Sequence, residues 1–186
     1  KRLLSDVLKI EPGQRVLDIG CGPADVLALL PESVEYHGFD LEPNYIATAR
    51  ARYGSRGNFE VRAVAPNAVD GIGDFDVVMG IAILHHLSDD EADSLFAGAA
   101  RVLRPGGRLV TIDPAFVKGQ NPIAWALARL DRGKFVRSPE AYVQLAGRHF
   151  GDVRLTVLHD LLAVPYTHAV LEVRAEEMAV MEHDAD

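Results

Sequence analysis

The stretch that most constrains this chain is VLDIGCGPAD, residues 16–25. An apolar run leads into an aspartate, followed by two glycines one residue apart and then a proline. Glycine permits positive φ and lets a ligand lie against the peptide plane, and Pro23 suits the first position of a helix. A strand, a tight glycine turn and a helix N-terminus together predict a nucleotide-type binding site at the end of a parallel sheet.

Length and composition favour one globular domain over residues 1–186. Hydrophobic residues make up 48% of the chain, and we find neither an apolar run long enough for a membrane span nor a secretory signal. The net charge of −8 argues against a nucleic-acid partner, which would favour a basic face. Cys21 is the only cysteine, so an internal disulfide is excluded, and we expect a reducing, cytoplasmic setting.

Apolar periodicity divides the chain into alternating strands and helices. It predicts strands over 15–19, 34–39, 58–63, 74–80, 108–112, 153–159 and 166–173. It predicts helices over 2–9, 23–30, 43–53, 88–103, 122–131 and 139–149. This alternation indicates βαβ units and a parallel sheet, and the last two strands are close enough in the chain to form an antiparallel hairpin.

Local signals mark three boundaries between these elements. Ser88 and Glu91 have the spacing of a capping box at the start of the fourth helix. The segment RPGG, residues 104–107, predicts a turn before the fifth strand. Residues 175–186 are acidic and lack a turn signal, so we expect a frayed tail.

The glycine turn departs from a nicotinamide fingerprint. That fingerprint, G-x-G-x-x-G, requires a third glycine where Asp25 follows Gly20 and Gly22. Asp18 precedes the first glycine by two residues, and Asp40 ends the next predicted strand. A carboxylate at the end of that strand can accept both hydroxyls of a ribose. Acids on both sides of the turn favour a cationic nucleoside without phosphates over a dinucleotide.

Four segments, in order along residues 2–113, resemble the class I S-adenosylmethionine-dependent methyltransferases. VLDIGCGPADVL is similar to their first glycine motif, and YHGFDLEPNYIATAR to the acidic end of their second strand and the helix after it. FDVVMGIAILHHLSD is similar to their fourth strand, and VLRPGGRLVTID to their fifth. The resemblance implies an α/β fold with a Rossmann-like, doubly wound, seven-stranded sheet in the order 3-2-1-4-5-7-6, mostly parallel with an antiparallel C-terminal strand.

The resemblance also implies a cofactor, S-adenosyl-L-methionine, whose product is S-adenosyl-L-homocysteine. Gly20 and Gly22 would let its methionine portion lie against the backbone, and Asp18 would organise this loop and the amino group through water. Asp40 would hold the ribose hydroxyls, with Leu41 against the adenine. The residues expected to bind the cofactor are Asp18, Gly20, Cys21, Gly22, Asp40, Leu41, Ala65, Gly80 and Ile81.

Two residues depart from the family pattern. Ala24 stands where many members have a third glycine, and we expect alanine to be tolerated there because it can begin a helix. Val64 stands where an acid would meet the adenine amino group, so Asn67 or backbone carbonyls would have to replace that contact.

Methyl transfer is an in-line displacement, so the protein mainly contributes alignment, and a base is needed only for a protonated acceptor. Two interpretations of His85 and His86 stay open: one imidazole serves as that general base, or both are structural. Asp113 either takes part in the site or only bonds the next turn. Cys21 is interpreted as a small turn-filling residue because no base is spaced to activate it. No metal site is predicted.

The acceptor site is expected to come from residues 114–150, a helical insertion between the fifth and sixth strands that covers the substrate. Its bulky side chains suggest three acceptor contacts, namely Phe116, Trp125 and Tyr142. A basic cluster in the insertion is interpreted either as a solvated loop or as an anion site; it comprises Arg132, Lys134 and Arg137.

The function predicted from the sequence is methyl transfer from S-adenosylmethionine to an O, N or C centre of a small metabolite. Residues 80–83 read GIAI rather than the NPPY of enzymes that methylate nucleic-acid base amines, which favours a small-molecule acceptor. Two alternatives stay open: a catalytically inactive ligand-binding domain of the same fold, and a nicotinamide-dependent oxidoreductase. The short first helix predicts an open site or one covered by a second subunit, as in a homodimer.

Overall fold

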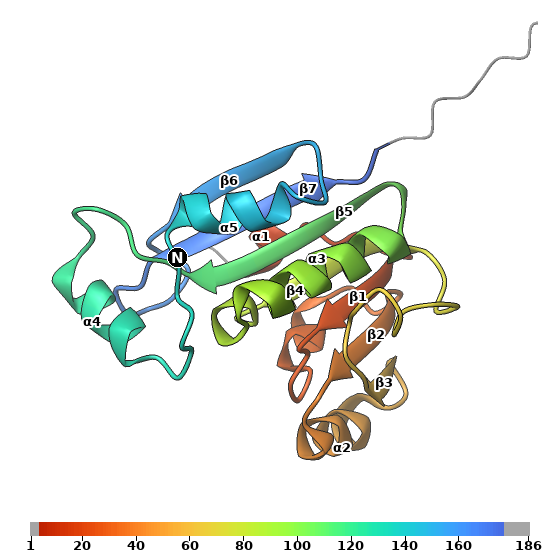
Figure 1. Ribbon diagram of the computed structural model, residues 1–186. Helices are drawn as coiled ribbons and strands as arrows, with labels where there is room; N and C mark the ends of the chain where they lie inside the picture. The colour runs from red at the N-terminus through yellow and green to blue at the C-terminus, as the bar shows by residue number, and fades with distance from the viewer. Residues whose placement is uncertain (1–3, 177–186) are drawn as a thin grey trace, which may run out of the picture.

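The computed structural model describes residues 4–176, which fold around one seven-stranded sheet (Figure 1). Its strands run in the order β3-β2-β1-β4-β5-β7-β6, which confirms the predicted topology. Strand β7 is antiparallel to both of its neighbours, and the other pairings are parallel. The strands are β1 (Arg15–Ile19), β2 (Glu35–Asp40), β3 (Gly57–Val61), β4 (Phe75–Ile81), β5 (Leu103–Pro114), β6 (Val153–Leu158) and β7 (His168–Arg174).

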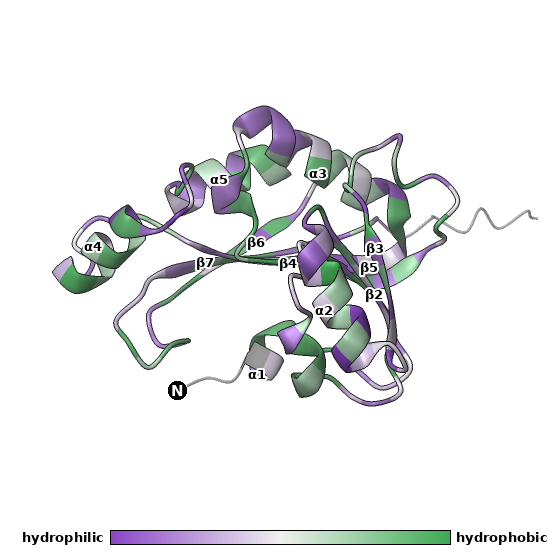
Figure 2. Cartoon of the chain, turned by 90° about the horizontal axis from the view of Figure 1, so that it is seen from below, coloured by the Kyte–Doolittle hydropathy of each residue, from purple (hydrophilic) through white to green (hydrophobic). Residues whose placement is uncertain are grey.

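Helices cover both faces of the sheet (Figure 2). They are α1 (Leu4–Leu8), the 3₁₀ helix η1 (Asp25–Leu29), α2 (Pro43–Tyr53), the 3₁₀ helix η2 (Leu84–His86), α3 (Asp89–Val102), α4 (Pro122–Leu130) and α5 (Pro139–Ala146). Helices α3 and α5 bury Phe96 and Leu145 in the core on one face, whereas α1 and α2 bury Leu8 and Ile46 on the other. Helix α4 projects beyond the end of the sheet where β5 finishes (Figure 1).

Helix α3 begins at the predicted capping box. The Ser88 hydroxyl accepts from the Glu91 amide at 3.4 Å, and the Glu91 carboxylate accepts from the Ser88 amide at 2.8 Å. These two bonds satisfy N–H groups that have no partner inside the helix. The cap therefore sets where the connection after β4 ends and where the buried face of α3 starts.

Two local predictions are wrong. Residues 23–30 were expected to form a helix opened by Pro23, but the structure has a 3₁₀ helix that begins at Asp25, because Ala24 has a left-handed φ of 59°. Residues 104–107 were expected to form a turn before the strand, but they lie inside β5. Leu103 pairs with Phe75 and Arg108 with Val77, so the four residues between bulge out of one continuous strand.

The remaining boundaries differ from the predictions by a few residues. The last helix ends at Ala146, and β7 begins at His168. The expected frayed tail lies mostly outside the described residues, which end at Glu176. Among the helices of residues 4–176, none combines the length and apolar character that a membrane crossing requires.

Candidate functional site

A cavity of about 270 Å³ opens where β1 and β2 end, and we call it the β1–β2 cavity. Its floor comes from these two strands, and one wall comes from the residues after β3. The opposite wall comes from Ile83, Leu87 and the first turns of α3. Carboxyl ends of neighbouring parallel strands are where open α/β sheets bind ligands. Four of the predicted cofactor-binding residues line it, namely Gly20, Asp40, Leu41 and Ala65.

The glycine turn packs tightly against the connection after β4. Gly20 has a φ of 70°, and a Cβ added there would lie 2.8 Å from Cδ1 of Ile83. The amides of Gly20 and Cys21 both donate to the Phe39 carbonyl, at 2.8 and 3.0 Å. An added Cβ at Gly22 would meet nothing within 4 Å, so the backbone there is open to a ligand. Gly20 lines the β1–β2 cavity, whereas Cys21 is buried and Gly22 lies outside the lining of that cavity.

Asp40 joins the glycine turn to the end of β2. Its Oδ2 accepts from the Gly22 amide at 2.9 Å, and its Oδ1 accepts from the Glu42 amide at 2.8 Å. Each carboxylate oxygen has a further lone pair, so both can still accept from a ligand hydroxyl. Leu41 is 69% exposed beside it and offers an apolar surface to a flat ring.

Asp18 lies beneath the glycine turn and does not line the β1–β2 cavity. It is buried, and its Oδ2 accepts from the Tyr36 hydroxyl at 2.5 Å. Burial raises the pKa of Asp18 to about 7, against the opposing effect of the Tyr36 hydrogen bond. Burial also raises the pKa of the Cys21 thiol, which keeps it protonated and agrees with its interpretation as a turn-filling residue.

The two departures from the family pattern have structural explanations. Ala24 adopts a left-handed conformation, the one that glycine takes at no steric cost, so this alanine does not begin a helix as expected. Val64 is 8% exposed and lines the β1–β2 cavity. An added Cβ at Gly98 of α3 would lie 3.1 Å from Val64 Cγ1, so α3 and the residues after β3 pack closely. The cavity wall near Val64 is therefore apolar.

Gly80 and Ile81 end β4 but do not line the β1–β2 cavity. An added Cβ at Gly80 would lie 3.0 Å from Cγ2 of Ile83, so Gly80 lies directly behind that side chain. Ile83 thus contacts both the glycine turn and the end of β4. Ile83 therefore lies between Gly80 and the β1–β2 cavity.

His85 lies between two carboxylates and is 2% exposed. Its Nδ1 is 2.9 Å from Asp113 Oδ1, and its Nε2 is 3.2 Å from Asp131 Oδ1. Asp113 Oδ1 also accepts from the His85 amide at 3.1 Å, so this strand-end acid bonds η2, which precedes it by 28 residues, rather than the next turn. Because both ring nitrogens face protein oxygens in a buried position, the structure favours a structural role for His85.

His86, by contrast, is exposed and packs its ring against that of His85, with centroids 4.1 Å apart. Partial burial lowers the pKa of the His86 imidazole, and neighbouring His85 acts in the same direction. A lowered pKa keeps the ring neutral near pH 7, with a free lone pair. Of the two candidates for a general base, His86 has the accessible nitrogens.

A second cavity, of about 520 Å³, lies on the other side of η2, and we call it the η2 cavity. Its polar residues include both histidines, Asp131 and Tyr166, and its apolar wall consists of Ala82, Leu127 and Leu130. Ile83 lines the β1–β2 cavity, whereas Ala82 and His86 line the η2 cavity. The connection between β4 and α3 therefore divides the two cavities.

Potential metal ligands do occur in the η2 cavity. Ligand atoms of His85, His86 and Asp131 lie within 4.8 Å of one another. Asp131 is already engaged, because its Oδ1 accepts from the Gly133 amide at 2.8 Å and its Oδ2 from the Tyr166 hydroxyl at 3.0 Å. Both oxygens of Asp131 therefore already accept hydrogen bonds, and His85 Nε2 faces the same carboxylate, so we assign no metal here.

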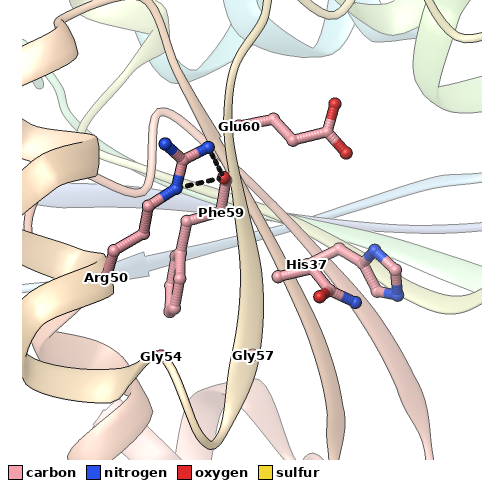
Figure 3. A pocket seen from close by; sticks show the side chains of 7 residues that line it. His37, Arg50, Gly54, Gly57, Phe59 and Glu60 are labelled. Carbon is pink, nitrogen blue, oxygen red and sulfur yellow. Dashed lines mark hydrogen bonds between the residues drawn. The ribbon is translucent and has the colours of Figure 1, made fainter.

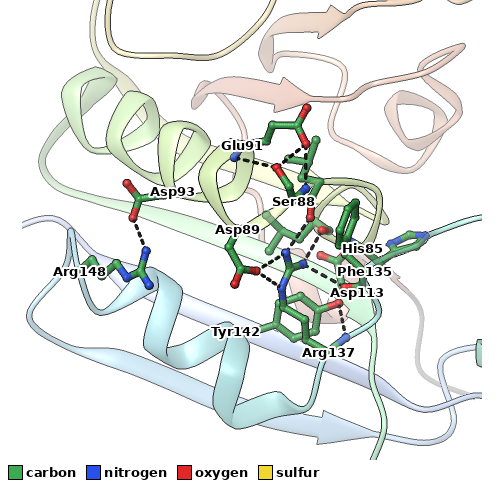
Figure 4. A network of polar contacts seen from close by, with 12 residues as sticks. His85, Ser88, Asp89, Glu91, Asp93, Asp113, Phe135, Arg137, Tyr142 and Arg148 are labelled. Atoms are coloured by element: carbon green, nitrogen blue, oxygen red, sulfur yellow. Dashed lines mark hydrogen bonds and ion pairs between the residues drawn. The ribbon is translucent and has the colours of Figure 1, made fainter.

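The insertion is attached to η2 by Arg137, which the sequence analysis did not single out from its basic cluster (Figure 4). Its guanidinium donates to the carbonyls of Leu84 at 2.9 Å and Leu87 at 2.7 Å, and it pairs with Asp89 at 2.7 Å. Its side chain is only 9% exposed, which excludes the solvated-loop interpretation for this residue. The partners lie 48 to 53 residues away, so no local pattern could have revealed them.

The peptide around Gly133 reinforces this attachment. The Phe135 amide donates to the His85 carbonyl at 3.0 Å. A Cβ on Gly133 would overlap the His85 ring, so only glycine permits this close approach. The insertion and η2 therefore form one packed unit.

The three predicted acceptor contacts are not brought together. Tyr142 is 1% exposed and donates its hydroxyl to the Pro114 carbonyl at 3.1 Å, so its prediction as a substrate contact is wrong, because α5 packs this face into the core. Phe116 and Trp125 pair with ring centroids 6.4 Å apart, but neither lines the η2 cavity. Leu127 and Leu130, two other bulky residues of the predicted insertion, do line it, and so does Tyr166, which lies outside residues 114–150 and was not predicted.

A further cavity, between α2 and β3, contains none of the predicted site residues (Figure 3). The Arg50 side chain points into it, but its Nε and a terminal nitrogen both donate to the Phe59 carbonyl, at 3.0 and 2.5 Å. Arg50 therefore links helix α2 to strand β3 through these two hydrogen bonds. We place the candidate functional site at the β1–β2 and η2 cavities, because these two contain predicted site residues.

Comparison with known proteins places the chain among methyltransferases. Residues 16–107 match a family model described as a methyltransferase domain. The chain is 28% identical, over 97% of its length, to a phosphoethanolamine N-methyltransferase of Triticum aestivum, of which it covers 35%.

Two solved structures have the same fold. One is an S-adenosylmethionine-dependent methyltransferase, SibL, with a TM-score of 0.73 and 20% identity, covering 94% of this chain and 55% of that one. The other is phosphoethanolamine N-methyltransferase 2 of Haemonchus contortus in complex with S-adenosyl-L-methionine, with a TM-score of 0.66 and 18% identity, covering 94% and 51%.

The chain thus spans only about a third to about half of the length of these three proteins. The matched segment contains the glycine turn, Asp40 and the connection that divides the two cavities, and it favours the methyltransferase interpretation over a nicotinamide oxidoreductase. The chain belongs to the class I S-adenosylmethionine-dependent methyltransferases.

Proposed function

We propose that the chain transfers a methyl group from S-adenosylmethionine to an O, N or C centre of a small molecule. The observation that carries this proposal is the pair of cavities on either side of one short connection, residues 82–87. The donor occupies the β1–β2 cavity, and the acceptor enters the η2 cavity. Such a partition brings two reactants together at one wall, which is the alignment that an in-line displacement needs.

The residues of the β1–β2 cavity suit this donor. Asp40 has free lone pairs for ribose hydroxyls, and Leu41 and Val64 offer apolar contact to the adenine. The open backbone at Gly22 accommodates the methionine portion. When bound, S-adenosylmethionine supplies an electrophilic methyl group on a sulfonium, so the protein need not activate it.

His86 is the base in this proposal. If the acceptor is a hydroxyl, the O–H proton passes to the neutral His86 imidazole as the new C–O bond forms and the bond from the methyl carbon to sulfur breaks. General-base help of this kind is worth roughly 10²- to 10⁴-fold. His85, fixed by Asp113, positions the connection that carries His86.

The test measures binding of S-adenosylmethionine by calorimetry to the Asp40→Ala variant. We expect affinity to fall by about 100-fold or more, because a charged acceptor of two ribose hydroxyls is lost. Asp152→Ala, at a carboxylate that is 71% exposed on the surface, is the matched control and should bind as the unaltered chain does.

Unchanged affinity in a folded Asp40→Ala variant contradicts the donor site. A screen of hydroxyl, amine and carbon-acid acceptors, with detection of S-adenosylhomocysteine, then separates an enzyme from an inactive binding domain. Donor binding without product formation across that screen supports the inactive alternative.

A further inference from the structure

Helix α4 buries its small side chains and exposes its large ones. Ala124 and Ala128 are each 2% exposed and pack against the rest of the domain. Ile123, Leu127 and Leu130 are 58%, 36% and 81% exposed. An amphipathic helix normally does the reverse, with its apolar face toward the core. Figure 2 shows α4 at the margin of the molecule with hydrophobic residues along it.

The three exposed aliphatic residues of α4 form one continuous surface, whereas the exposed Trp125 lies on another side of the helix. Positions i, i+4 and i+7 lie on the same side of a helix, so Ile123, Leu127 and Leu130 make a single stripe. We call these three residues the α4 stripe. The buried alanines occupy a different side of α4, so packing within the domain does not account for the stripe.

The α4 stripe continues into the η2 cavity. Leu127 and Leu130 belong to the stripe and also line the cavity. His86 lines the polar end of the same cavity. A molecule seated with its reactive atom near His86 can therefore extend along apolar side chains toward Ile123. This continuity indicates that the stripe contacts the ligand that binds in the η2 cavity.

Other occupants fit the observations less well. A stable protein–protein interface needs about 20–30 residues on each side, whereas the stripe offers three. The chain's net charge of −8 opposes approach to an anionic lipid surface. A small molecule with an apolar body matches both the size of the stripe and its connection to the cavity.

We infer that the methyl acceptor is amphiphilic: a nucleophilic head lies in the η2 cavity beside His86, and an apolar body of several carbons lies along Ile123, Leu127 and Leu130. This inference rests on the proposed function for the identity of the η2 cavity as the acceptor site. It narrows the substrate class from any small metabolite to one with an alkyl or aromatic extension.

The only tryptophan of the chain, Trp125, is on the same helix, 51% exposed, and reports on ligands there by its fluorescence. The probes are 4-ethylphenol and 4-hexylphenol, titrated into the full chain with and without S-adenosylhomocysteine. Each buried methylene is worth roughly fourfold in affinity. We expect 4-hexylphenol to bind at least about tenfold more tightly than 4-ethylphenol, since its four extra methylenes lie on the stripe.

The double variant Leu127→Gln/Leu130→Gln should lose most of that preference. Leu155→Gln changes a leucine of β6 that is also 36% exposed and should retain it. Thermal unfolding of each variant confirms that the fold is intact. Equal affinity for the two phenols in the unaltered chain, or a preference that survives the double variant, overturns the inference.

Two further measurements decide between occupants. Sedimentation that finds a dimer abolished by the double variant assigns the stripe to a second copy. Binding to phosphatidylcholine vesicles that the double variant abolishes assigns it to a membrane. Either result overturns the inference. If the unaltered chain does not bind S-adenosylmethionine in calorimetry, the proposed function itself is wrong. Failure of the proposed function can therefore be distinguished from failure of this inference.

Discussion

Helices α3 and α4 each form a wall of one cavity, yet they are built in opposite ways. Helix α3 borders the β1–β2 cavity and sends Leu95, Phe96 and Val102 into the core. Helix α4 borders the η2 cavity and sends alanines inward and leucines outward. The wall of the proposed donor cavity is therefore part of the hydrophobic core, whereas the wall of the proposed acceptor cavity is an attachment whose large side chains face outward. Substitutions in α3 should lower the free energy of unfolding, and substitutions in α4 should weaken ligand binding.

The comparison is tested most strongly by the same substitution on each helix. Leu95→Ala removes a side chain that is 3% exposed and should destabilise the fold by about 2–5 kcal/mol through lost burial and a cavity. Leu130→Ala removes one that is 81% exposed and should change stability by about 0.5 kcal/mol or less. Urea denaturation of both variants provides the measurement, and equal losses would show that α4 is as much a part of the core as α3.

The donor side also contains a buried acid whose charge is coupled to folding. Because the pKa of Asp18 is raised to about 7 from 3.8, the folded state holds a proton that the unfolded state releases between these values. Stability should therefore fall as pH rises from 4 to 7, by at most about 4 kcal/mol, and then level off.

Urea denaturation at pH 4.5 and at pH 7 compares the unaltered chain with Asp18→Asn, which cannot ionise. The variant should lose most of this pH dependence. If both proteins show the same fall between the two pH values, other groups cause it, and Asp18 is ionised in the fold.

The attachment of the acceptor side to the connection is tested by a pair of arginines. Arg137→Ala removes a guanidinium that donates to the Leu84 and Leu87 carbonyls of the connection and to Asp89 of α3. It should destabilise the fold by about 2–3 kcal/mol, since two partly buried carbonyls lose a charged donor. Arg148→Ala breaks an exposed pair with Asp93 and should cost about 1 kcal/mol or less.

Activity and binding of S-adenosylhomocysteine to both variants then sharpen the comparison. We expect Arg137→Ala to lower turnover more than donor affinity, because the same connection carries His86. If donor affinity falls as much as turnover does, the two cavities are not independent, and Arg137 supports both walls equally.

The polar end of the site shows where sequence reasoning stopped. The pair His85–His86 was recognised, but its two members could not be told apart, because adjacent residues share every local signal. Burial separates them, with Asp113 and Asp131 on either side of His85. Asp131 comes from the insertion, 46 residues after His85 by their numbers in the chain. Only the folded chain brings these three groups together.

The sequence by itself determined the strands, the glycine turn and the position of Asp40, because apolar periodicity, glycine spacing and strand ends act over a few neighbouring residues. The strand order was implied by the resemblance to the class I methyltransferases and not by these local patterns. The tertiary structure decided the left-handed conformation of Ala24, the burial of Tyr142, the role of Arg137 and the outward face of α4. Those features depend on contacts between distant segments, since a side chain's burial is set by what packs against it and not by its neighbours in the chain.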